Sequence, residues 1–144
     1  MALRVLVADD CPLVQRSIRE VLESAHILNL VEARDGHEAV RAAGQMQPDV
    51  AILDYSMPGM NGIDAARLIR LTRPQLPIVL LTSVAEEYLI AAALREGIRG
   101  YVLKRDAADD LVRAIEAARR GVTYVSPRAA RVLCERRLQA PEPR

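Results

Sequence analysis

The sequence predicts an α/β fold, a doubly wound five-stranded parallel sheet with helices on both faces. Short apolar runs alternate five times with longer amphipathic stretches along the 144 residues. The connections between the apolar runs are too long for hairpins, so consecutive strands should be parallel. The runs are continuously apolar instead of alternating with polar residues, which indicates strands buried on both faces of the sheet.

Each expected strand is a run rich in Val, Ile and Leu. The strands are expected at 3–8, 28–33, 50–53, 78–81 and 100–103. The second of them is followed by Asp35 and Gly36, a pair typical of turns.

The expected helices follow the strands and carry apolar residues at helical spacing. They are expected from Pro12 onward and from Gly36 to about residue 46, then at 63–71, 86–96 and 107–120. Gly121 closes the last of these helices. A further helix is expected at 126–139, because Ser126 is a good N-cap and Pro127 suits the first helical position. Residues 140–144 are interpreted as a linker or a frayed end.

Length and composition set the broad class of protein. A chain of 144 residues with 51% hydrophobic residues is expected to form one domain with a packed core. The net charge of +1 gives no global sign of nucleic-acid binding. Cys11 and Cys134 match no metal or redox spacing. With no signal peptide and no bilayer-spanning run, we expect a cytoplasmic protein that does not contact the membrane.

Chemically active side chains follow four of the expected strands. Asp9 and Asp10 follow the first strand and Asp54 follows the third. Thr82 and Lys104 follow the fourth and fifth strands. The carboxyl ends of parallel strands lie at one edge of the sheet, where open α/β sheets bind ligands.

Three neighbouring carboxylates repel one another, and a divalent cation would relieve that repulsion. Hard oxygen ligands suit Mg²⁺. Lys104 is the only lysine among twenty basic side chains, and lysine provides a compact point charge where arginine provides a planar fork. Together with the Thr82 hydroxyl, these groups indicate a site for a phosphoryl group, in which a carboxylate can itself be the nucleophile.

Four motifs carry a resemblance to a known family. They are "VLVADD", "ILDYSMPGMNG", "VLLTS" and "GYVLK", and they occur in this order. Over residues 3–122 the chain resembles a CheY-like receiver domain of a bacterial two-component response regulator. Residues 100–133 resemble the NarL/FixJ (LuxR-type) group. The resemblance implies a flavodoxin-like sheet followed by a C-terminal linker helix.

The resemblance also implies roles for single residues. Asp54 is the expected phosphoacceptor for a sensor histidine kinase. Asp10, helped by Asp9, is expected to hold Mg²⁺ together with Asp54 and the backbone carbonyl of Ser56.

Three further residues receive roles from the resemblance. Lys104 is expected to contact the phosphoryl group and Thr82 to act as the switch hydroxyl. Tyr101 is expected to be the aromatic residue whose rotamer is coupled to Thr82.

The same resemblance implies a domain organisation and an output. Residues 1–122 are expected to be the receiver domain, and 123–144 the linker helix and tail. The expected output is transcriptional, through a DNA-binding domain that this chain lacks, with a phosphorylation-dependent homodimer. The chain is not expected to be an enzyme beyond its own phosphorylation and dephosphorylation.

Alternatives remain open at this stage. A magnesium-dependent phosphatase with an aspartyl nucleophile usually has a second acid two residues after that nucleophile, and Ser56 stands there. An interaction module that has lost phosphorylation is the other alternative, and the retained strand-end residues count against it. The chain is either an excised receiver or a stand-alone one, and the arginine-bearing helix at its end favours the excised form.

Overall fold

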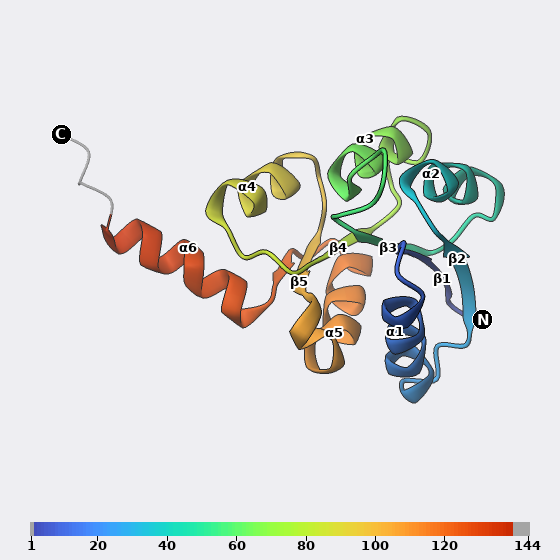
Figure 1. Cartoon of the computed structure of the whole chain (residues 1–144), viewed down its shortest axis with the longest axis horizontal. Coiled ribbons are helices and arrows are strands. Elements are labelled where there is room, and N and C mark those ends of the chain that lie inside the picture. Colours follow the sequence, from blue (N-terminus) through green and yellow to red (C-terminus); the bar gives the residue numbers. More distant parts are fainter. Residues whose placement is uncertain (1, 140–144) are drawn as a thin grey trace.

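A computed structural model describes residues 2–139 as a six-stranded parallel sheet between two layers of helices (Figure 1). The strand order is β2-β1-β3-β4-β5-β6, and all five pairings between neighbours are parallel. The strands are β1 (Arg4–Ala8), β2 (Asn29–Ala33), β3 (Val50–Asp54), β4 (Ile78–Thr82), β5 (Gly100–Leu103) and β6 (Tyr124–Val125).

The helices cover both faces of the sheet, as the sequence predicts. Helices α2, α3 and α4 pack on one face, and α1 and α5 pack on the other (Figure 1). The helical elements are α1 (Pro12–Ser24), α2 (Gly36–Gln45), α3 (Gly62–Thr72), α4 (Glu87–Arg95), the 3₁₀ turn η1 (Lys104–Asp106), α5 (Ala107–Arg119) and α6 (Pro127–Gln139).

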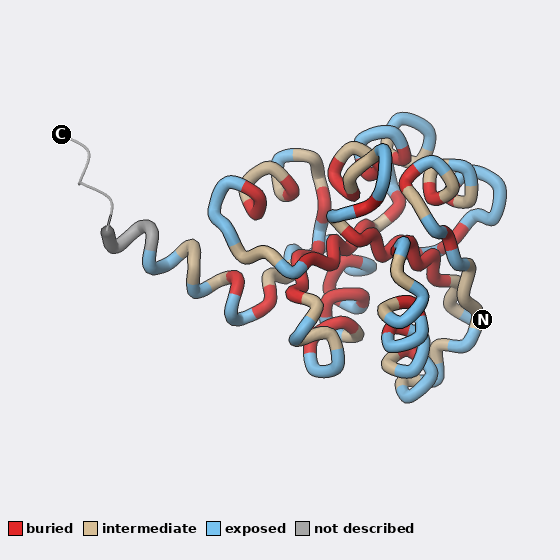
Figure 2. Tube along the Cα trace, in the orientation of Figure 1, coloured by how far each residue is buried: buried red, intermediate tan, exposed pale blue. Residues whose placement is uncertain are grey.

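Side chains of the apolar strands pack into two separate cores, one on each face of the sheet. Because side chains alternate along a strand, Leu6 and Leu53 face the α2–α4 layer while Val7 and Ile52 face α1 and α5. Every residue of β3 and β4 is buried, whereas the edge strands β2 and β6 are mostly half-buried, so burial is greatest at the centre of the sheet (Figure 2). The continuous apolar runs therefore report burial on two faces, and the flavodoxin-like α/β class is confirmed.

The prediction of five strands is wrong, because a sixth strand lies at the β5 edge. Gly121 adopts a left-handed conformation with φ of 75° after α5 and turns the chain back toward the sheet. The N–H groups of Tyr124 and Ser126 then donate to the carbonyls of Arg99 and Tyr101, each at 2.8 Å. A strand of two residues is too short to show a periodic pattern in the sequence.

Two local predictions also need correction or completion. Asp35 and Gly36 do not form a free turn: Asp35 is the N-cap of α2 and accepts a hydrogen bond from the N–H of Glu38 at 2.8 Å. The helix expected at 126–139 is present as α6, and its role as a linker stays a prediction. The expected linker at 140–144 lies outside the described residues.

Within 2–139, no helix has the length and apolar character needed to cross a bilayer.

A matched pair of glycines tests how tightly α3 packs against the end of β3. A Cβ on Gly62 would lie 2.5 Å from the carbonyl oxygen of Asp54, whereas a Cβ on Gly44 of α2 would meet open space. We expect Gly62→Ala to lower the free energy of unfolding by about 1–3 kcal/mol through overpacking. Gly44→Ala should raise it by up to about 1 kcal/mol through helix propensity. Urea unfolding measures both, and an unchanged stability of Gly62→Ala would contradict the close approach.

Candidate functional site

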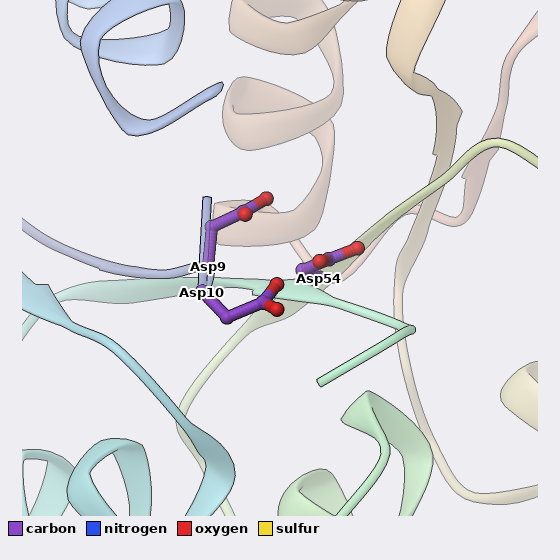
Figure 3. Close-up of side chains that lie close together, drawn as sticks. All are labelled: Asp9, Asp10 and Asp54. Atoms are coloured by element: carbon purple, nitrogen blue, oxygen red, sulfur yellow. The ribbon is translucent and has the colours of Figure 1, made fainter. Parts of the chain in front are cut away.

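The three carboxylates expected at the strand ends meet in one place. Oxygen atoms of Asp9, Asp10 and Asp54 all lie within 4.8 Å of one another (Figure 3). The cause is the register of the central strands, in which Ala8 of β1 is paired with Leu53 of β3. Asp9 and Asp54 are 1% and 2% exposed, while Asp10 is open to solvent. The site therefore holds two buried acids and one exposed acid at the carboxyl edge of the sheet.

Lys104 is the cation of this site. It begins η1, directly after β5, and its Nζ lies 2.9 Å from Oδ1 of Asp54 and 3.5 Å from Oδ2 of Asp9. Its side chain is 25% exposed, so the ammonium bridges two buried carboxylates at the rim. A single lysine thus partly balances two of the three acids.

The ionisation of Asp54 reflects this incomplete balance. Burial raises the pKa of Asp54 to about 6, and the negative charge of Asp9 acts in the same direction. The hydrogen bond and the charge of Lys104 lower it only in part. Burial by itself lowers the pKa of Lys104, but Asp54 and Asp9 outweigh it and the pKa is raised above its ordinary value. The lysine therefore stays charged, whereas ionisation of Asp54 is disfavoured by its burial and by the negative charge of Asp9.

Two buried oxygen atoms suit a further cation. Oδ2 of Asp9 and Oδ2 of Asp54 accept no hydrogen bond from any residue in the described part of the chain. A buried carboxylate oxygen that accepts no hydrogen bond is costly, and for Asp9 only the Lys104 ammonium at 3.5 Å offsets part of that cost. Carboxylate oxygens clustered at this spacing are hard ligands of the kind that Mg²⁺ takes. The residues present therefore fit the magnesium site predicted from the sequence.

Thr82 and Tyr101 are joined through the backbone of one residue, Val84. The Thr82 hydroxyl oxygen accepts from the N–H of Val84 at 3.1 Å, and the Tyr101 hydroxyl donates to the carbonyl of Val84. Thr82 is 2% exposed and Tyr101 is fully buried. Burial, followed by the charge of Glu86, raises the pKa of Tyr101 above its ordinary value, so the phenol stays a donor. The side chains of β4 and β5 thus hold the β4–α4 loop together.

Ser56 lies in the exposed loop after β3. Its N–H donates to Oδ1 of Asp54 at 3.4 Å, a long hydrogen bond. The loop ends at Asn61, whose side chain accepts from the N–H of Asp64 and caps α3. The structure places Ser56 beside the acid cluster, and the role of its carbonyl stays a prediction.

Sequence reasoning missed one buried residue at the site, Gln15 of α1. Its Nε2 donates to the carbonyl oxygens of Asp9 at 3.0 Å and of Ala33 at 2.6 Å, and so joins the ends of β1 and β2. Gln15 shares the buried face of α1 with Ile18 and Leu22. A polar residue on an otherwise apolar face was the signal available in the sequence.

A model of the response regulator receiver domain matches residues 5–116. This chain belongs to that family. The family resemblance indicated by the four sequence motifs is therefore confirmed, and the acid cluster occupies the matched region.

Relatives of known name place this receiver domain among LuxR-type regulators. The transcriptional regulatory protein LnrK of Bacillus subtilis (strain 168) is 32% identical over 126 residues, which cover 87% of this chain and 57% of LnrK. A two-component response regulator of the LuxR family from Aurantimonas sp. SI85-9A1 superposes with a TM-score of 0.90 at 32% identity, over 96% of this chain and 100% of that one.

A second solved structure, of the response regulator RcsB in complex with DNA, gives a TM-score of 0.84 at 30% identity. The match covers 98% of this chain and 72% of RcsB. The receiver chain thus spans a little over half the length of LnrK and about three quarters of that RcsB chain.

The raised pKa of Asp54 predicts a pH-dependent stability in Mg²⁺-free buffer. Between the ordinary value of 3.8 and about 6, the folded protein binds more protons than the unfolded chain. The contribution of Asp54 is therefore most favourable below this window and is lost as the pH rises through it, on the order of 3 kcal/mol at most. In Asp54→Asn this dependence should vanish, so the variant gains stability relative to the wild type between pH 4 and pH 8. Urea unfolding with EDTA measures the difference.

The exposed Asp49, which precedes β3 at its opposite end, provides the control. Asp49→Asn keeps Asp54, so the loss of stability across this window should remain in that variant. Parallel profiles of the wild type and Asp54→Asn would contradict the raised pKa.

Gln15→Leu tests the link between β1 and β2. Loss of the two hydrogen bonds removes the Gln15 donor from the carbonyl of Asp9 and leaves the carbonyl of Ala33 with the N–H of Asp9 alone, which should cost about 1–3 kcal/mol. Because the backbone of the acid pair is then less fixed, the dissociation constant for Mg²⁺, measured by calorimetry, should rise several-fold. Exposed Gln75→Leu is the control. An unchanged Mg²⁺ affinity in a destabilised Gln15→Leu would reduce this residue to a structural role.

Proposed function

We propose that this receiver domain is a phosphorylation-dependent signalling switch in which Asp54 accepts a phosphoryl group. The observation that carries the proposal is the state of Asp54: a 2%-exposed carboxylate with one oxygen beside Lys104 at 2.9 Å and the other without a hydrogen bond from the described residues. A buried carboxylate with a free oxygen and an adjacent fixed cation is suited to nucleophilic attack on phosphorus.

In the proposed reaction, the free oxygen of Asp54 attacks the phosphorus atom of the donor. A phosphorus–oxygen bond to Asp54 forms as the bond to the leaving group breaks, and the leaving group departs with that electron pair. For a histidine kinase the leaving group is the imidazole nitrogen of its phosphohistidine. Lys104 balances the charge on the phosphoryl oxygens, which is most of what phosphoryl transfer requires of a protein.

Mg²⁺ is the proposed cofactor, and it would supply positive charge that offsets the acids and the phosphoryl oxygens. The residues proposed to hold it are Asp9, Asp10 and Asp54, with the backbone carbonyl of Ser56. The fit rests on the cluster of oxygens within 4.8 Å and on Oδ2 of Asp9, which is buried and accepts no hydrogen bond from the described residues although the Lys104 ammonium lies 3.5 Å away. Gln15 keeps the backbone of Asp9 in place for this task.

The proposed switch runs through Val84. When a phosphoryl group is present on Asp54, the Thr82 hydroxyl donates to it and releases the N–H of Val84. Because the Val84 carbonyl also accepts from Tyr101, a displacement of Val84 changes its hydrogen bonds with both Thr82 and Tyr101. The expected result is a new conformation of the β4–α4 loop and of the α4–β5 surface.

The partners and output of the whole protein follow from the family. We propose a sensor histidine kinase as phosphoryl donor, a homodimer that depends on phosphorylation, and a cytoplasmic location. Residues 1–122 would form the receiver and 123–144 a linker to a DNA-binding output domain. RcsB, which this chain resembles, has been solved with DNA, and this supports a transcriptional output.

Two alternatives fit the site less well. A phosphatase of the aspartyl type needs a second acid near the nucleophile, and the position two residues after Asp54 is Ser56. An interaction module without phosphorylation has no need of a lysine that pairs with two buried carboxylates, because such a buried arrangement is seldom stabilising. Turnover of the protein's own phosphoryl group is the catalysis we propose.

Acetyl phosphate with Mg²⁺ provides the test, followed on a phosphate-affinity gel. We expect a retarded band for the wild type that disappears with EDTA and in Asp54→Asn. Asp49→Asn should retain the band, since Asp49 lies at the opposite end of β3. A wild type that shows no band and gives no tyrosine fluorescence change with beryllofluoride and Mg²⁺ would favour the interaction module instead.

A further inference from the structure

Helix α6 is attached to the strand that leads into the phosphoryl site. Ser126, just before α6, is fully buried, and its N–H donates to the carbonyl of Tyr101 at 2.8 Å. Its hydroxyl oxygen accepts from the N–H of Leu103, the residue before Lys104, at 3.4 Å. Ala129 in the first turns of α6 is fully buried in the same core as Tyr101 and Leu103. The start of α6 therefore lies directly against β5.

A second attachment connects α6 to η1. Nε of Arg128 donates to Oδ1 of Asp106 at 3.1 Å, and the Asp106 side chain is only 13% exposed. Asp106 is the last residue of η1 and Lys104 is the first. This three-residue turn thus carries the site's cation at one end and the anchor of α6 at the other.

Beyond its first turns, α6 contacts the domain mainly through Leu133, which is partly buried against the core. It extends away from the β5 edge of the sheet (Figure 1), and of residues 127–135 only Ala129 is buried. Val132 of α6 and Ala91 of α4 line a cleft of about 450 Å³. A helix with one buried residue and few side-chain anchors can be released by a change at one of those anchors.

We propose that α6 is docked in the unphosphorylated protein through the Asp106–Arg128 pair and is released when Asp54 is phosphorylated. The proposal rests on the proposed function of Asp54. In the unphosphorylated form Lys104 pairs with Asp54 and Asp9. A phosphoryl group on Asp54 carries its negative charge farther from the sheet than the carboxylate does. Lys104 moves outward to pair with it and shifts η1, so Asp106 moves relative to Arg128. Asp106 and Arg128 are thus positioning residues, and neither touches the phosphoryl group.

Linkage gives this coupling a second consequence. If phosphorylation weakens the docking of α6, then undocking α6 must strengthen the binding of a phosphoryl mimic by the same factor. An ion pair with one exposed partner limits that factor to about fivefold. Two measurements, one at α6 and one at the site, must therefore agree.

The first measurement uses Cys134, which is exposed on α6. In a Cys11→Ser background, a spin label on Cys134 reports how firmly α6 is held. We expect its mobility to rise when beryllofluoride and Mg²⁺ are added, and to be already raised in Arg128→Ala without them. Arg131→Ala is the matched control, because Arg131 is exposed on the same helix and forms no ion pair among the described residues.

The second measurement is the affinity for beryllofluoride at saturating Mg²⁺. Arg128→Ala should bind it up to about fivefold more tightly than the wild type, and Arg131→Ala should be unchanged. The double variant Asp106→Asn/Arg128→Ala should match Arg128→Ala alone, since both changes break one pair. A wild-type label that does not respond, in a protein whose Asp54 is shown to be phosphorylated, would overturn the release of α6 and leave the switch chemistry standing. Failure of both phosphorylation and beryllofluoride binding would overturn both proposals.

Discussion

The repulsion among Asp9, Asp10 and Asp54 is the constraint around which the carboxyl edge of the sheet is organised. The register of β1 against β3 forces the two buried acids together, and only one lysine is provided to balance them. The site is therefore left with negative charge in excess and with buried oxygens that accept no hydrogen bond from the described residues. Such a site favours the binding of a cation, and a change of charge on Asp54 alters the electrostatic balance among the three acids and Lys104.

The residues proposed to respond to that charge are distributed over two neighbouring strands. β4 ends at Thr82 and connects through Val84 to the loop before α4, while β5 ends at η1, which touches α6. Tyr101 belongs to both routes, because its hydroxyl reaches Val84 and its backbone carbonyl accepts from Ser126. One event at Asp54 can thus alter the α4 side and the α6 side of the same edge.

Much of this could be predicted from the sequence, for identifiable reasons. The strands and most helices follow from apolar periodicity, and the site follows from the rule that parallel strands end at a common edge. The sixth strand was missed because two residues carry no period, and its pairing depends on a left-handed Gly121. Gln15 and Val84 were missed for another reason: they act through backbone carbonyls and N–H groups, whose partners are set by tertiary structure.

The division of the interior into two cores has a consequence for how the domain can diversify. The cores lie on opposite faces of the sheet, so the backbone of the strands separates their side chains. Substitutions in the α1 and α5 layer should therefore add independently to those in the layer of α2, α3 and α4. Tyr101 and Ala129 belong to the layer of α2, α3 and α4, so substitutions around α1 and α5 should leave the packing of these two residues unchanged. The sheet thus keeps a change of packing on one face apart from the contacts on the other.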